Sequence, residues 1–210
     1  MKQLLLIAGL TWASVCQPCL ADDSSPPPAK PAESAAVPAT KSSGPPRVQV
    51  VTNMGNFVVE LNLERAPLTV QHFLAYVEQG FYNGTVFHRV VPNFVIQGGG
   101  LDTNYNLKSA PLKVVNESGN GLTNARGTIG AARGNDPHGS DAQFYINLYD
   151  NAALDPNATR WGYAVFGKVI QGMEVVDKIG NVSTGSHGAI KEDVPLKPIV
   201  IERIERVSGP

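Results

Sequence analysis

Alternating apolar and polar positions mark the first elements of the chain. Along residues 57–63 apolar side chains occupy every second position around Glu60 and Asn62, which is the period of a half-buried strand. Residues 48–52 precede this strand across the tetrapeptide Asn-Met-Gly-Asn, which predicts a hairpin turn. Over residues 66–80 the period becomes helical, with a proline suited to the first turn and a glycine suited to the end.

Short apolar runs, each broken by Gly, Pro or Asn, fill most of the remaining sequence. We expect them to form strands at residues 85–91, 94–98, 127–132, 143–148, 163–169 and 198–205. A second short helix is predicted at about residues 172–179, where three apolar residues recur at helical spacing. Many short strands with two helices are typical of an antiparallel barrel or sandwich with helical lids, so the pattern predicts a mainly β domain.

The first 46 residues differ in composition from the rest. One lysine and an apolar stretch from Leu4 to about Val15 precede a small-residue site that ends at Ala21, which predicts a secretory signal peptide over residues 1–21. Residues 22–46 are rich in Pro, Ala and Ser and nearly free of large apolar side chains, which predicts a disordered linker. One domain is then expected over residues 47–210, in a periplasmic or secreted protein.

Both cysteines of the chain, Cys16 and Cys19, lie inside the predicted leader. Cleavage after Ala21 would leave a mature protein with neither a disulfide nor a thiolate. Lipid attachment at Cys16 is a second hypothesis, although the three residues before it lack the leucine expected there. The apolar stretch is too short for a membrane span, so no integral span is expected after signal removal.

Charge and motif content give no support to several classes of function. The 17 lysines and arginines nearly balance the 18 aspartates and glutamates, so we expect no nucleic-acid partner. The four histidines lack zinc-site spacing and the glycine-rich segments fit no phosphate loop, so we expect no metal and no cofactor. We expect a monomer because no sustained extra apolar face is visible.

The segment "FHRVVPNFVIQGGG", residues 87–100, sets Arg89 and Gln97 among apolar residues, with no acid, thiol or hydroxyl beside them. Together with "AQFYINL" at 142–148, "ALD" at 153–155 and "GYAVFGKVIQGMEVVDKI" at 162–179, it resembles the cyclophilin family of peptidyl-prolyl isomerases. The similarity extends from about residue 50 to 206. It implies an eight-stranded antiparallel β-barrel capped by two α-helices, with substrate peptide bound in a groove on the outer face.

Catalysis of X-Pro isomerisation requires a hydrogen-bond donor but no nucleophile, which fits the residues of this segment. Rotating the amide costs roughly 18–20 kcal/mol because C–N double-bond character is lost. In the twisted transition state the proline nitrogen regains its lone pair, and a donor aimed at it stabilises that state more than the planar ground state. Arg89 fits this role because its fork is rigid, charged and donor-only. Its neighbours in sequence offer no obvious carboxylate for the alternative role, an ion pair.

The resemblance implies the remaining roles. Phe94 and Gln97 are expected to act with Arg89 in catalysis. Phe94 would line the pocket for the proline ring, and Gln97 would bind the substrate backbone and orient Arg89. The other residues implied to bind substrate are Val95, Ala132, Arg133, Gln143, Tyr145, Leu154 and Tyr163. The alternation of side chains along a strand does not settle which of residues 94–97 face the groove, because Pro92 and Asn93 interrupt the strand.

The sequence departs from the family pattern at several of these positions. Ala153 replaces a tryptophan found in many eukaryotic members, which makes cyclosporin binding doubtful. Tyr163 replaces a histidine, as in the bacterial exported branch, and Tyr145 replaces a phenylalanine. Arg133 stands where asparagine is frequent and predicts an altered preference beside the proline.

Two functions therefore remain at the level of sequence. The first is a peptidyl-prolyl cis-trans isomerase that accelerates X-Pro rotation in exported, unfolded or flexible polypeptides. The second is a proline-motif binding module or envelope chaperone with incidental isomerase activity. Arg89 favours the first, because a binder does not need a transition-state donor.

Overall fold

The computed structural model describes residues 44–207. The predicted signal peptide and residues 22–43 of the predicted linker lie outside the described residues. The predicted hairpin is present, with β1 over Arg47–Thr52 and β2 over Gly55–Leu61 in antiparallel register. The Thr52 hydroxyl closes its turn by donating a hydrogen bond to the Gly55 carbonyl at 2.6 Å.

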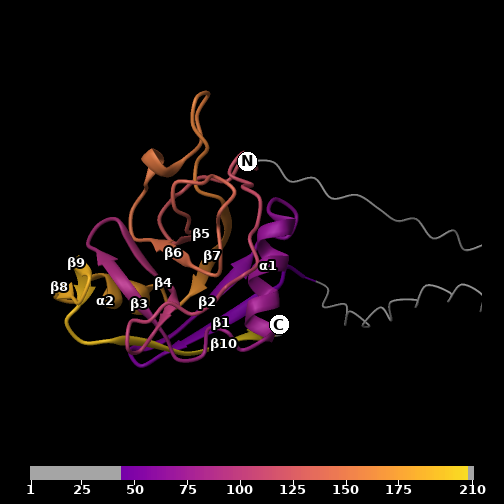
Figure 1. Cartoon of the computed structure of the whole chain (residues 1–210). Helices are drawn as coiled ribbons and strands as arrows, with labels where there is room; N and C mark the ends of the chain where they lie inside the picture. Colours follow the sequence, from indigo (N-terminus) through magenta and orange to yellow (C-terminus); the bar gives the residue numbers. More distant parts are fainter. Residues whose placement is uncertain (1–43, 208–210) are drawn as a thin grey trace, which may run out of the picture. The chain divides into compact units, whose positions relative to one another are not determined.

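Eight antiparallel strands close into a barrel in the order β1-β10-β3-β4-β6-β5-β7-β2, which confirms the predicted fold (Figure 1). The remaining barrel strands are β3 (Thr85–Val91), β4 (Val95–Asp102), β5 (Thr128–Ala131), β6 (Phe144–Asn147), β7 (Val165–Gln171) and β10 (Ile199–Val207). Each overlaps an apolar run that predicted it, with bounds that agree within two residues except for β4, which extends four residues beyond the predicted 94–98. A short 3₁₀ helix, Ala152–Leu154, lies in the connection between β6 and β7.

Two helices complete the domain, and Figure 1 shows them on opposite sides of the strands. Helix α1, Pro67–Glu78, packs Phe73 against the rings of Phe144 and Phe166 from the barrel. Its N-cap, Ala66, supplies no side-chain hydrogen bond, and the distant Glu117 carboxylate instead accepts from the Thr69 amide at 2.8 Å. Helix α2, Met173–Gly180, buries Val176 and Ile179 in the same core.

The register of β4 shows which of its side chains point into the barrel and which point outward. Ile96 pairs across the sheet with Ile146 of β6, which pairs with Ile129 of β5, and all three are fully buried in the core. Because successive side chains of a strand point to opposite faces, Val95 and Gln97 face outward. The structure thus settles which side chains of this segment face outward, which the sequence pattern left open.

A two-stranded sheet, β8 (Thr184–His187) and β9 (Ile190–Pro195), stands apart from the barrel sheet. It lies against β3, as Figure 1 shows. The ring of His187 stacks on that of Tyr105 at 4.1 Å, which attaches this hairpin to the loop after β4. The sequence did not predict this hairpin because residues 184–193 are mostly polar and show no apolar alternation.

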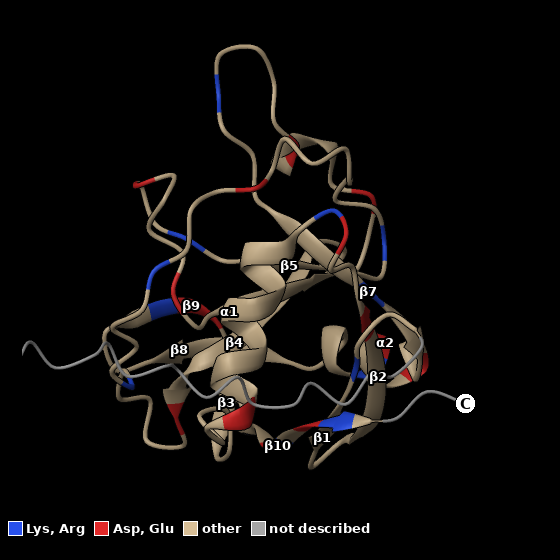
Figure 2. Cartoon of the chain, turned by 90° about the vertical axis from the view of Figure 1, so that its right-hand side faces the viewer, with Lys and Arg blue, Asp and Glu red and all other residues tan. Residues whose placement is uncertain are grey.

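Acidic and basic positions are interspersed along the elements visible in Figure 2. Across residues 44–207 no helix is both long enough and apolar enough to cross a membrane.

Candidate active site

Three of the predicted residues form one row across the outer face of the barrel. Arg89 of β3 pairs in register with Gln97 of β4, and Gln97 pairs with Tyr145 of β6. Residues directly opposite one another on neighbouring strands project to the same face. The sheet therefore presents a cation, an amide and an aromatic ring side by side, and the Arg89 side chain is 40% exposed.

A small apolar cluster, separate from the main core, surrounds the end of this row. Its members are six of the ten predicted site residues: buried Val95, Ala132 and Tyr145, and partly buried Phe94, Leu154 and Tyr163. They come from the β3–β4 turn, β4, β6, the 3₁₀ helix and the segments that follow β5 and precede β7. We call this group the apolar cluster. An aromatic and aliphatic surface of this kind suits a proline ring.

Tyr145 lies flat on the sheet because its cross-strand neighbour is a glycine. A Cβ atom on Gly130 would lie 2.3 Å from the Tyr145 hydroxyl oxygen, too close for any side chain. The hydroxyl donates to Asn124 Oδ1 at 2.5 Å. Burial raises the pKa of Tyr145 above its ordinary value, so the hydroxyl remains a neutral donor. The departure from phenylalanine therefore adds an anchoring hydrogen bond beneath the apolar cluster.

Buried amides extend this anchor to the rest of the apolar cluster. Asn124 Nδ2 donates to Asp155 Oδ1 at 2.8 Å, next to Leu154. Asn151 Nδ2 donates to the Phe94 carbonyl at 2.9 Å. Sequence reasoning missed these supporting residues, because both lie in loop segments where asparagine is common and gives no sign of burial. Buried polar groups normally hydrogen-bond, and the structure shows these two asparagines doing so.

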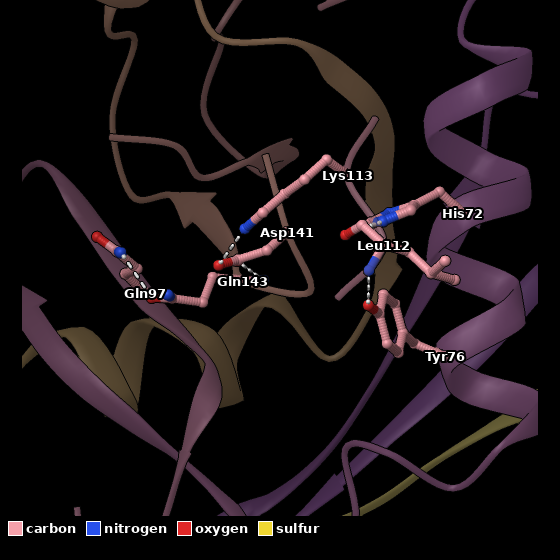
Figure 3. Close-up of polar contacts among 7 residues, drawn as sticks. All are labelled: His72, Tyr76, Gln97, Leu112, Lys113, Asp141 and Gln143. Carbon is pink, nitrogen blue, oxygen red and sulfur yellow. Dashed lines mark hydrogen bonds and ion pairs between the residues drawn. The ribbon is translucent and has the colours of Figure 1, made fainter. Parts of the chain in front are cut away.

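The two predicted glutamines contact one another, with Gln97 Nε2 donating to Gln143 Oε1 at 3.4 Å (Figure 3). The backbone amide of Gln143 donates to Asp141 Oδ1 at 3.0 Å, and Lys113 pairs with that carboxylate at 3.4 Å. A Cβ on Gly100 would lie 2.4 Å from Gln143 Cγ, so the glycine run makes room for this side chain. The pair can offer amide donors and acceptors to a peptide backbone.

Arg133 contacts a residue of the apolar cluster through its guanidinium. Its guanidinium stacks over the Tyr163 ring at 4.5 Å and donates from Nη2 to the Trp161 carbonyl at 3.0 Å. Ala132, beside it, donates its amide to the Gln143 carbonyl at 3.0 Å. Both predicted residues thus lie next to the apolar cluster, and the visible role of Arg133 is to hold Tyr163.

Arg89 has a carboxylate partner that the sequence did not reveal. Its Nε lies 3.3 Å from Asp193 Oδ2 of β9. The expectation that no carboxylate lies near Arg89 was wrong, because residues 104 positions apart meet only once the β8–β9 hairpin folds against β3. Both side chains keep solvent exposure, 40% for Arg89 and 26% for Asp193, so the ion pair leaves the guanidinium accessible.

A cavity of about 690 Å³ lies at another part of the barrel. It is lined by β2, β7, the segment 121–128 and residues 44–46, and it includes none of the ten predicted site residues. Its size alone does not make it a candidate active site.

Replacing Gly130 by alanine is expected to lower the free energy of unfolding by about 1–3 kcal/mol, the usual cost of overpacking. The new methyl group would displace the Tyr145 ring and break its hydrogen bond to Asn124. Catalytic efficiency should fall as well, because the apolar cluster loses its aromatic base. Urea unfolding and a peptide isomerisation assay would measure the two effects. Gly134→Ala is the matched control, since nothing lies within 4 Å of its Cβ position.

The comparisons with known proteins agree with this geometry. The family model for cyclophilin type peptidyl-prolyl cis-trans isomerase/CLD matches residues 47–206. A peptidyl-prolyl cis-trans isomerase of Acinetobacter baylyi is 48% identical over 158 residues, covering 75% of this chain and 84% of that protein. Peptidyl-prolyl cis-trans isomerase B of Escherichia coli is 45% identical over 156 residues, covering 73% and 94% respectively.

Solved structures lead to the same family. The crystal structure of a Cryptosporidium parvum cyclophilin type peptidyl-prolyl cis-trans isomerase superimposes with a TM-score of 0.64 at 26% sequence identity. The match covers 80% of this chain and all of that one. The chain therefore belongs to the cyclophilin-type peptidyl-prolyl cis-trans isomerases, which confirms the resemblance found in the sequence, and its class of activity is the isomerisation of X-Pro bonds.

Proposed function

We propose that Arg89 catalyses X-Pro isomerisation by donating a hydrogen bond to the imide nitrogen of a proline seated on the apolar cluster. The observation that carries this proposal is the row of Arg89, Gln97 and Tyr145 beside that cluster. The cluster receives the ring, the glutamine amides bind the flanking peptide, and the guanidinium reaches the nitrogen as the bond turns. Phe94 and Leu154 supply the exposed parts of the surface that the ring contacts.

The energy required is within reach of such a site. Each 1.36 kcal/mol of differential stabilisation gives about tenfold in rate, so an acceleration of about 10⁵-fold needs roughly 7 kcal/mol. A preformed charged donor contributes a large share, because removing one such donor from other enzymes costs about 10²–10³-fold. Clamping of the peptide by Gln97 and Gln143 in a productive geometry supplies more.

The substrates we propose are proline-containing segments of exported, unfolded or flexible polypeptides. The apolar stretch from Leu4 to about Val15, the small-residue site at Ala21 and the proline-rich residues 22–46 support export. The cysteine-free sequence after Ala21 supports it as well, because such a domain is indifferent to an oxidising compartment.

Exchange spectroscopy on an Ala-Pro reporter peptide tests the function. Catalytic amounts of the protein should raise the cis/trans exchange rate of the peptide well above its spontaneous value. Saturable peptide binding without faster exchange would instead support the second hypothesis, a proline-motif binding module or envelope chaperone. Binding and exchange can be read from the same titration, so the two outcomes are separable.

Intact mass of the protein recovered from a bacterial host tests the proposed export. Cleavage after Ala21 predicts a mature chain that starts at Asp22 and carries no lipid. A mass that corresponds to a chain starting at Cys16 with added acyl groups would favour the lipoprotein hypothesis. An uncleaved chain would contradict export in that host.

A further inference from the structure

The β8–β9 hairpin lies against β3, and an ion pair joins the two. Oδ2 of Asp193, on β9, lies 3.3 Å from Nε of Arg89. The contact therefore involves the Nε edge of the guanidinium. Since a guanidinium is planar, fixing its Nε edge restricts the directions in which the two Nη groups can point.

The backbone of Asp193 supports a specific role for this residue. It has φ of +65°, a left-handed conformation that only two other non-glycine residues among residues 44–207 adopt. Aspartate tolerates this region better than most residues, although it is still less favourable there than glycine. The hairpin holds Asp193 in this conformation while its side chain reaches the face of β3 that carries Arg89. Strain of this kind persists where the surrounding structure enforces it, often at functional sites.

The ion pair contributes little to folding. Both partners are partly exposed, and exposed pairs of this kind have little effect on stability. The effect of the ion pair is therefore to orient the Arg89 side chain, which is flexible and lies on an open surface. An unrestrained arginine would sample many rotamers and would spend only part of its time directed at the apolar cluster.

We infer that Asp193 is a positioning residue, which holds Arg89 by its Nε edge so that the Nη groups face the proline nitrogen. The inference rests on the proposed role of Arg89 and adds a residue from outside the barrel to the catalytic apparatus. It also gives the β8–β9 hairpin a function. The stacking of His187 on Tyr105 attaches the other strand of this hairpin to the loop after β4, so the hairpin is held at two points.

Asp193→Asn tests the inference, because asparagine keeps the shape of aspartate and its tolerance of positive φ while it removes the charge. We expect kcat for an Ala-Pro peptide to fall about 3- to 10-fold with KM nearly unchanged. The matched control is Glu192→Gln, which removes the same charge from an exposed neighbour in the same strand. That variant should retain the wild-type kcat.

Two further measurements separate positioning from a structural effect. The ¹⁵N order parameter of the Arg89 Nε–H should fall in Asp193→Asn and stay unchanged in Glu192→Gln. In the Arg89→Ala background, measured at high enzyme concentration, Asp193→Asn should have no further effect on the residual rate. An equal proportional loss in both backgrounds would overturn the inference.

The kcat values of Asp193→Asn and Arg89→Ala distinguish failure of the positioning role from failure of the catalytic role. An unchanged kcat in Asp193→Asn would overturn the inference, and an increased kcat would show that Asp193 restrains Arg89 instead. If Arg89→Ala itself keeps the full rate, the proposed catalytic role of Arg89 fails. If Arg89→Ala loses activity while Asp193→Asn does not, only the positioning role fails.

Discussion

Arg89→Ala is expected to lower kcat/KM by about 100- to 1000-fold, the usual cost of removing one preorganised donor from a transition state. The loss should lie in kcat, because the donor acts on a nitrogen that accepts a hydrogen bond only when the bond is twisted. Peptide binding should change little, since the apolar cluster and the two glutamines remain. Exchange spectroscopy gives the rate, and a titration with the same peptide gives the affinity.

Two controls sharpen this prediction. Arg89→Lys keeps a charge but loses the rigid fork, so it should retain only part of the lost rate. Arg203→Ala removes another half-exposed arginine, on β10, that forms an ion pair at 3.2 Å with Glu205, and it should leave the rate unchanged. A rate for Arg89→Ala within about threefold of the wild type would contradict a catalytic role for this side chain.

The barrel itself was predictable because its strands obey simple local rules. Runs such as residues 85–91 and 198–205 combine apolar side chains with flanking Gly, Pro or Asn, and they became β3 and β10. The helix over 66–80 was predictable from its period and from Pro67, and it spans Pro67–Glu78. That the strands close into a barrel was implied by the family resemblance, because periodicity alone allowed a sandwich as well as a barrel.

The candidate site was predictable as far as it depends on local patterns. The family resemblance, recognised from the motif around Arg89 and the later segments, implied six residues that the structure gathers into one cluster. Contacts made only by folding were not predictable. The ion pair with Asp193 depends on a polar hairpin that has no apolar period, and the anchor beneath Tyr145 depends on Asn124 in the segment before β5.

The geometry of a closed barrel explains why catalytic residues can lie on a wall of sheet. Inward positions such as Ile96 and Ile146 fill the core, so every alternate position on the same strands is available outside. Cross-strand pairing then places side chains from separate parts of the sequence in one row. Because each strand is hydrogen-bonded on both sides, this row is preorganised, as electrostatic catalysis requires.

His88, the neighbour of Arg89 on β3, is expected to make folding sensitive to mild acid. Its side chain is buried, and its Nδ1 has no hydrogen-bond partner among residues 44–207. Burial, together with the adjacent Arg89 charge, lowers the pKa of His88 from 6.5 to about 4. The unfolded chain therefore binds a proton near pH 6.5 that the folded protein accepts only near pH 4.

The stability of the folded protein should therefore fall with acidification. The full stability is present above pH 6.5, and it should decline as the pH falls from 6.5 toward 4, because protons favour the unfolded state in this window. The gap between the two pKa values corresponds to a loss of about 3 kcal/mol. Urea unfolding of the wild type at a series of pH values between 7.5 and 4 measures this slope.

His88→Gln provides the comparison, because glutamine is polar, similar in length and does not titrate. The variant is expected to be less stable than the wild type at pH 7.5, and the difference should shrink as the pH falls toward 4. Carboxylates titrate in both proteins, so their contribution cancels in the difference. Parallel stability curves for the two proteins across this range would show that the folded protein accommodates a charged His88, and that water or a local opening reaches the imidazole.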